Sequence, residues 1–237
     1  MVGPVGILLI IVVWTVLQAL GWALVYVPHV PSGFLYAPGI DPGRYPDLAE
    51  ALYISLVTLA TLGYGDVVAV SPVLRLLSPL QALTGFILFT AGVSWLLQLY
   101  STLSRRRALG LRLSVLRRSR YAESLTAADE SSATVLHDIA EQLVQIRVDL
   151  GQNSETYYFA ESDTATCLPL GMQYCQELSH RAKGSAVASV ASAGATLEAA
   201  VMDLSILMRQ QFVPGSGEGA DEVIEAALAD HACDRGS

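Results

Sequence analysis

The chain has 237 residues, of which 52% are hydrophobic and 15% are charged, and its formal net charge is -8. This composition excludes a basic nucleic-acid-binding protein and indicates a protein of the membrane. The charges are unevenly spread, because seven arginines lie within residues 105–120 whereas the chain after Tyr121 is acidic.

The first predicted element is a membrane helix over residues 5–27. This stretch contains no charged side chain, and at about 1.5 Å per residue it can cross a hydrocarbon core of about 30 Å. A signal peptide is the alternative. The stretch lacks a basic leading region, however, and is longer than the apolar core of a typical signal peptide.

A loop rich in proline and glycine, residues 28–46, precedes a shorter helix. Asp47 and Glu50 have the spacing of a capping box with Asp47 as the N-cap, which predicts a helix over residues 47–60. This helix is too short to span a membrane. It fits a re-entrant pore helix, because the partial negative charge at its C-terminal end can face a cation.

The hexapeptide Thr-Leu-Gly-Tyr-Gly-Asp follows as residues 61–66. A cation crossing a bilayer exchanges its water for other oxygens, and a run of backbone carbonyls can supply them. Pointing successive carbonyls in one direction requires backbone angles that glycine adopts at little cost. The sequence therefore predicts an ion-binding filter with Asp66 at its outer mouth. The residues that bind ions in this filter are Thr61, Leu62, Gly63, Tyr64 and Gly65.

In this hexapeptide the chain resembles the potassium channel pore family, and within it the bacterial members with two transmembrane helices. Thr-x-Gly-Tyr-Gly-Asp is the selectivity signature of that family, and Leu62 stands where valine is usual. The resemblance implies that residues 61–64 coordinate potassium, as the permeant ion rather than as a cofactor. Because one loop cannot encircle an ion, four chains are expected to assemble as a homotetramer.

A second membrane helix is predicted over residues 72–103, since Ser71 and Pro72 form a helix start and no charge follows from Leu76 to Leu103. Counting along the family motif places a gating hinge at Gly85. Close helix packing is the alternative role for this glycine. The same counting implies four side chains that line the cavity and the inner constriction: Phe86, Phe89, Val93 and Leu97.

The basic segment, residues 105–120, sets the expected topology. Positive residues beside a membrane helix stay on the cytoplasmic side. Both termini are therefore expected in the cytoplasm, in a multi-pass protein of the cell membrane whose filter faces outward. Arg105, Arg106 and Arg107 are also expected to face lipid and to bind anionic headgroups.

Residues 121–237 carry five basic and eighteen acidic side chains, which predicts a helical cytoplasmic domain. Apolar residues at spacings of 3 and 4 predict an amphipathic helix that packs in a globular core or, alternatively, in a short tetrameric coiled coil. These residues are Leu136, Ile139, Leu143, Ile146 and Leu150. A long alanine-rich helix from Val187 to Met208 resembles a third span, but Glu198 and Asp203 inside it would be costly in lipid.

The three cysteines, Cys167, Cys175 and Cys233, predict reduced thiols in a cytoplasmic compartment, because their number is odd and their spacing forms no disulfide framework. Together with His180 they match no familiar metal-ligand spacing. No arrangement of nucleophile and base points to catalysis. The chain is therefore predicted not to be an enzyme.

The sequence predicts an all-α membrane protein with a transmembrane pore domain (1–104), a basic juxtamembrane segment (105–120) and an acidic helical domain (121–237). The expected function is passive, potassium-selective conduction by a homotetramer that is gated at its inner helices and modulated by the cytoplasmic domain. A weakly selective cation channel is one alternative. A membrane-anchored helical sensor or scaffold is the other.

Overall fold

The computed structural model describes residues 2–125, 130–159 and 164–230. The described chain is mostly helical and divides into two compact units, an N-terminal unit (Pro4–Leu97) and a C-terminal unit that begins at Gln98. One helix, α3 (Pro72–Arg118), starts in the N-terminal unit and continues into the C-terminal unit.

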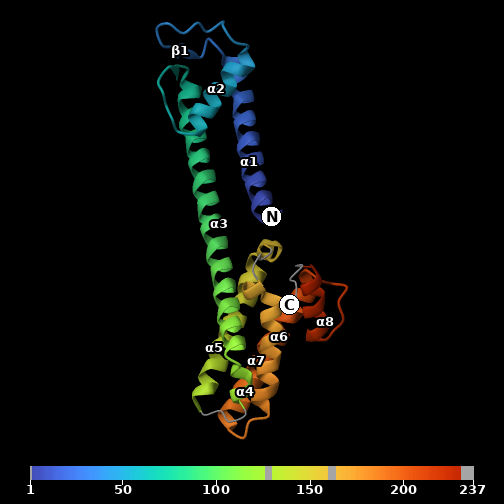
Figure 1. Ribbon diagram of the computed structural model, residues 1–237. Helices are drawn as coiled ribbons and strands as arrows, with labels where there is room; N and C mark the ends of the chain where they lie inside the picture. Colours follow the sequence, from blue (N-terminus) through green and yellow to red (C-terminus); the bar gives the residue numbers. More distant parts are fainter. Residues whose placement is uncertain (1, 126–129, 160–163, 231–237) are drawn as a thin grey trace. The chain divides into compact units, whose positions relative to one another are not determined.

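The N-terminal unit contains α1 (Val2–Tyr26), α2 (Asp47–Leu59) and the first part of α3 (Figure 1). Both α1 and α3 are long and apolar enough to cross a membrane. The 13 residues of α2 are too few to do so. Helices thus lie where the sequence predicted the two membrane helices and the short helix between them.

A small β-ribbon, which the sequence did not predict, lies outside these helices. Strands β1 (Phe34–Tyr36) and β2 (Val67–Ala69) pair antiparallel, and a short helical turn, η1 (Val27–His29), precedes them. Strands of three residues are too short to give an alternating pattern. The ribbon ties the loop after α1 to the chain that follows the hexapeptide.

The start of α2 corrects the predicted capping box. The N-cap is Pro46, and Asp47 is already the first helical residue, with no side-chain capping bond. The carbonyl of Pro46 instead accepts the backbone N–H groups of Ala49 and Glu50, at 2.8 and 3.1 Å. Because proline fixes its own φ, the turn forms without the Asp47 side chain.

A polar network joins the three helices of the N-terminal unit. Tyr26 on α1 donates its hydroxyl to Gln81 Oε1 on α3 at 2.6 Å. Gln81 Nε2 donates to the carbonyl and hydroxyl of Ser55 on α2, at 2.9 and 2.8 Å. The Ser55 hydroxyl donates in turn to the carbonyl of Ala19 on α1 at 2.8 Å. All four residues are buried. Buried polar groups need hydrogen-bond partners, and these bonds supply them for Tyr26, Ser55 and Gln81.

The C-terminal unit packs the end of α3 with five further helices around one apolar core (Figure 1). These are α4 (Tyr121–Ser124), α5 (Glu130–Gln152), α6 (Leu168–Lys183), α7 (Ala188–Gln211) and α8 (Ala220–Asp230). Short helical turns η3 (Ser154–Tyr158) and η4 (Thr164–Thr166) lie between α5 and α6. The predicted apolar stripe of α5 is buried in this core, as the globular alternative required.

Helix α3 runs beyond its predicted end at Leu103. It continues through the basic segment to Arg118, because no proline interrupts it there and Leu109 and Leu113 are buried in the core of the C-terminal unit. Gly110 lies between these leucines, where a Cβ atom would stand 2.8 Å from the Cα of Thr166. Glycine at this position lets η4 approach the helix.

Helix α7 has the length and hydropathy of a membrane span, as do α1 and α3. It packs against α5 and α6, however, with Val190, Leu197 and Leu204 fully buried. Its two carboxylates have basic partners, since Glu198 pairs with Lys183 at 2.7 Å and Asp203 pairs with Arg147 at 3.3 Å. The expectation that α7 belongs to a folded domain agrees with this packing.

The cysteines do not follow the prediction of three reduced thiols. Cys167 is disulfide-bonded. Cys175 is a free, fully buried thiol, and burial raises its pKa to about 12. Cys233 lies outside the described residues. An odd number of cysteines requires one free thiol, but it does not identify which cysteine remains free.

We predict opposite effects of two glycine-to-alanine substitutions in the C-terminal unit. Gly110→Ala should lower stability by about 1–3 kcal/mol, because its methyl group meets backbone atoms of Thr166. Gly151→Ala on α5 should raise stability by about 0.5–1 kcal/mol, since nothing lies within 4 Å of the added Cβ and alanine favours a helix. Thermal unfolding of the full-length protein followed by circular dichroism measures both. An equal change in the two variants would contradict the close contact at Gly110.

Candidate functional site

In the hexapeptide, residues with a positive φ alternate with residues whose φ is not positive. Thr61, Gly63 and Gly65 have φ values of +55°, +55° and +77°, whereas Leu62 and Tyr64 do not have positive φ. Left-handed angles at alternate residues turn successive carbonyls toward the same side of the chain, the arrangement that a ladder of oxygen ligands requires. A left-handed β-branched residue such as Thr61 is rare and marks a strained backbone position, a feature that is common at functional sites.

The two ends of this loop are anchored to the fold. At its start, the N–H groups of Thr61 and Leu62 donate to carbonyls of the last turns of α2, those of Thr58 and Val57, both at 3.0 Å. At its end, the carbonyl of Asp66 accepts the N–H of Ala37 at 2.8 Å. Within the described part of the chain, no backbone N–H donates to a carbonyl of residues 61–65. Five carbonyl oxygens therefore remain available to another ligand.

Asp66 is held by two further hydrogen bonds. The Tyr53 hydroxyl on α2 donates to Asp66 Oδ2, and Asp66 Oδ1 accepts the N–H of Val67 at 3.0 Å. The bond between Tyr53 and Asp66 connects α2 directly to the far end of the loop.

The loop and one face of α3 are exposed in the single chain. Tyr64 has 67% of its surface exposed, and residues 61–65 are all exposed. The four side chains expected to line the cavity, Phe86, Phe89, Val93 and Leu97, are exposed as well. Large apolar side chains exposed together in this way mark a contact surface for lipid or for another chain.

Gly85 is packed tightly against α2. A Cβ atom at this position would lie 2.0 Å from the carbonyl oxygen of Leu59. Helix α3 is continuous through Gly85. Close packing therefore accounts for this glycine in the structure, and its role as a hinge stays a prediction. Gly92, one further glycine along α3, has only one atom of Ile11, at 3.9 Å, near its Cβ position.

The three arginines predicted to face lipid have different surroundings. Arg106 is 4% exposed, and its guanidinium donates to the carbonyls of Thr156 and Phe159 at 2.8 and 2.6 Å, so the expectation that it faces lipid is wrong. Arg105 forms a bidentate pair with Asp149 on α5, with both distances 2.7 Å. Arg107 is exposed, and a lipid-facing role for Arg105 and Arg107 stays a prediction.

Sequence reasoning did not single out Gln81, which organises the polar network of the N-terminal unit. A signal was present, because Gln81 is a polar residue inside a long charge-free stretch. Polar groups in a membrane helix are costly unless they find partners. Gln81 therefore pointed to an interhelical contact, although its partners Tyr26 and Ser55 lie far away in the sequence.

A comparison with protein families supports the interpretation of this region. Residues 9–101 match the model of an ion channel family, a family of transport proteins rather than enzymes. The matched region contains α1, α2, the hexapeptide and the apolar part of α3. The N-terminal unit thus contains the part of the chain that matches an ion channel family.

Two curated proteins are distantly similar to the chain. The "Putative potassium channel protein RPA4233" of Rhodopseudomonas palustris is 28% identical over 101 residues, which is 43% of this chain and 23% of that protein. The "Uncharacterized membrane protein YdjJ" of Bacillus subtilis is 22% identical over 138 residues, which is 58% of this chain and 36% of that protein. The chain therefore spans between about a quarter and a third of the length of these relatives. No solved structure matches the chain.

We predict that Tyr53→Phe loosens the end of the loop. The substitution removes one hydroxyl donor from Asp66 and leaves the aromatic ring in place. If the loop selects potassium over sodium, as proposed below, this selectivity should fall about two- to tenfold, the equivalent of one hydrogen bond of about 0.5–1.5 kcal/mol. Ion flux from proteoliposomes measures the change. Tyr45→Phe on the outer loop removes a hydroxyl from an exposed tyrosine and serves as the control; equal selectivity in the two variants would contradict a bracing role for Tyr53.

A pair of substitutions on α3 tests the packing of Gly85. Gly85→Ala should destabilise the N-terminal unit by about 1–3 kcal/mol, because the methyl group collides with the end of α2. Gly92→Ala should change stability little, since only Ile11 is near. Tryptophan fluorescence during thermal unfolding measures both effects, because the three tryptophans of the chain lie before Leu97. If Gly85→Ala keeps full stability and only reduces opening, the glycine acts as a hinge and not as a packing residue.

Proposed function

We propose, on the premise that residues 9–101 form an ion channel domain, that four copies of this chain form a channel that conducts potassium passively across the cell membrane. The observation that carries the proposal is the loop at residues 61–65, whose backbone alternates in hand and whose carbonyls accept no backbone hydrogen bond among the described residues. Carbonyl oxygens in this arrangement replace the hydration shell of a cation.

Selectivity for potassium is supported by the signature Thr-x-Gly-Tyr-Gly-Asp at residues 61–66. The bond between Tyr53 and Asp66 adds support, because it fixes the end of the loop to α2 and so limits changes in its width. One distant relative carries a name that refers to a potassium channel. A weakly selective cation channel is the alternative, and it would need a loop that tolerates ions of different size.

The exposure of the loop supports a tetramer. A single copy of residues 61–65 presents its carbonyls from one side only, and Tyr64 is left exposed. Four copies around an axis would surround the ion and cover the tyrosine. The exposed side chains of Phe86, Phe89, Val93 and Leu97 would then line the cavity and the inner constriction, where apolar rings gate by dewetting.

The proposed topology places both termini and the C-terminal unit in the cytoplasm. The arginines that follow the apolar part of α3 support this orientation, because positive residues beside a span remain inside. Since α3 continues from the conduction domain into the C-terminal unit, binding events in that unit have a helical route to the gate. We assign the C-terminal unit a modulating role on this ground.

Potassium flux in proteoliposomes tests the proposal. The purified protein should release trapped potassium, barium should block the release, and Gly63→Asp should abolish it, because an aspartate with φ near +55° adds strain and charge inside the filter. The matched control is Gly39→Asp, which places the same residue at a left-handed glycine of the outer loop, where φ is +94°. This control should keep its flux.

The competing functions give different results in the same assay. Equal flux of sodium and potassium would indicate a weakly selective cation channel. A well-folded tetramer that passes no ion under varied pH, calcium and lipid composition would favour a membrane-anchored sensor or scaffold. A chain that remains monomeric in lipid would contradict the proposed conduction path altogether.

A further inference from the structure

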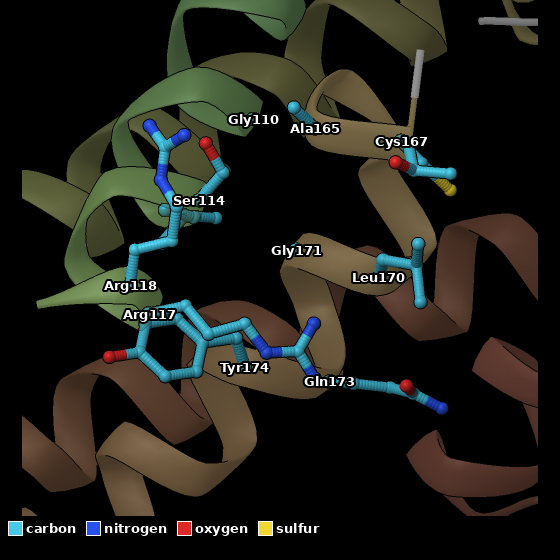
Figure 2. A pocket seen from close by; sticks show the side chains of 12 residues that line it. Gly110, Ser114, Arg117, Arg118, Ala165, Cys167, Leu170, Gly171, Gln173 and Tyr174 are labelled. Atoms are coloured by element: carbon cyan, nitrogen blue, oxygen red, sulfur yellow. The ribbon is translucent and has the colours of Figure 1, made fainter. Parts of the chain in front are cut away.

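A pocket of about 480 Å³ lies in the C-terminal unit, between the last turns of α3 and the first turns of α6. Figure 2 shows Ser114, Arg117 and Arg118 along α3 and Leu170, Gly171 and Gln173 along α6. This volume is in the range of pockets that bind small organic ligands and is far larger than one water molecule needs. Neither the conduction path nor the polar network of the N-terminal unit uses it.

The charged residues that line the pocket are all basic. Arg117 and Arg118 belong to the lining, and no aspartate or glutamate does. The ion pairs that the structure describes in this unit involve other basic residues. Arg117 lies over the ring of Tyr174, 5.9 Å from its centroid, which leaves its planar N–H groups able to donate. Two guanidinium groups with no carboxylate among the described lining residues favour an anion.

One end of the pocket is shaped by glycine. A Cβ atom on Gly171 would lie 2.9 Å from Leu113 Cδ1, so α3 and α6 meet closely there. Leu113 and Leu170 are buried and give this end an apolar surface. The arginines, in contrast, are exposed at the rim. The pocket thus presents a cationic rim above an apolar floor.

We propose that this pocket binds a small organic anion that carries a phosphate group. Arg117 and Arg118 would hold the phosphate by paired N–H donors, the amide of Gln173 would add a donor, and the organic part would rest on Leu113 and Leu170. Inorganic phosphate alone would leave most of the volume unfilled.

The phosphate has two possible sources, a soluble metabolite or a lipid headgroup. Arg117 lies twelve residues beyond Arg105, the first charge after the apolar stretch of α3. At about 1.5 Å per residue, this is on the order of 18 Å along the helix. The headgroup layer extends only about 5–8 Å beyond the hydrocarbon core. The distance favours a soluble ligand.

Calorimetric titration of the full-length protein in detergent tests the site. The probes are ATP, AMP, glucose 6-phosphate and inorganic phosphate. We expect saturable binding of at least one organic phosphate, and weaker binding of inorganic phosphate. The double variant Arg117→Gln/Arg118→Gln should raise the dissociation constant roughly tenfold or more. Ser114→Leu, which fills the pocket and keeps its charge, should weaken binding as well.

The matched control is Arg112→Gln. Arg112 lies on the same helix but outside the pocket, where it pairs with Asp138 at 3.4 Å. Its replacement removes the same charge and should leave the affinity within about twofold of the parent. Circular dichroism and thermal unfolding establish that each variant is folded before its affinity is compared.

Other results would overturn the proposal or identify the source of the phosphate. An equal loss of affinity in Arg112→Gln and in the double variant would show that binding depends only on diffuse surface charge, which would contradict a specific site. If no probe and no lipid binds saturably, the proposed site does not exist. If only nanodiscs that contain phosphatidylglycerol stabilise the protein, and only with Arg117 and Arg118 present, the phosphate is that of a lipid. None of these measurements depends on ion conduction, so the site and the proposed channel fail independently.

Discussion

The N-terminal unit depends on a backbone that turns left-handed at every second residue between positions 61 and 65. The conformation is inexpensive at Gly63 and Gly65, and strain is confined to Thr61, where a β-branched residue in this region costs about 1–3 kcal/mol. Such a residue persists only where its surroundings hold it. The last turn of α2 holds one end of the loop, and the bonds from Ala37 and Tyr53 to Asp66 hold the other. Between these anchors, the carbonyls of residues 61–65 accept no backbone hydrogen bond from the described residues, and they are therefore available to a ligand.

The elements that the sequence predicted well are those with a local cause. The hexapeptide is recognisable because ligand chemistry dictates neighbouring residues, and the membrane helices are recognisable because lipid excludes charge over a continuous stretch. One failure has a distant cause. Arg106 was expected to face lipid, yet its partners are carbonyls of Thr156 and Phe159, about fifty residues further on. The predicted capping box is wrong for a local reason. Pro46, and not Asp47, is the N-cap of α2.

The basic segment and the acidic domain were interpreted as separate regions, and the structure makes them one. On the last part of α3, Arg105 forms an ion pair with Asp149 and Arg112 forms one with Asp138. Leu109 and Leu113 of the same helix are buried in the core of the C-terminal unit. The acidity of the C-terminal chain thus partly neutralises the helix that it surrounds. Arg117 and Arg118 lie beyond this neutralised stretch, which explains why the last turn of α3 retains its positive charge.

The network around Gln81 has a consequence for how the protein is made. Helix α2 cannot cross a bilayer, and Ser55 and Gln81 would each be stranded in hydrocarbon if their helices entered lipid separately. Tyr26, Ser55 and Gln81 satisfy one another, so the three helices are expected to enter the bilayer as one hydrogen-bonded group. A leucine at position 81 would leave the Tyr26 hydroxyl without its acceptor and would remove both bonds to Ser55, so the polar connection between the three helices depends on this one amide.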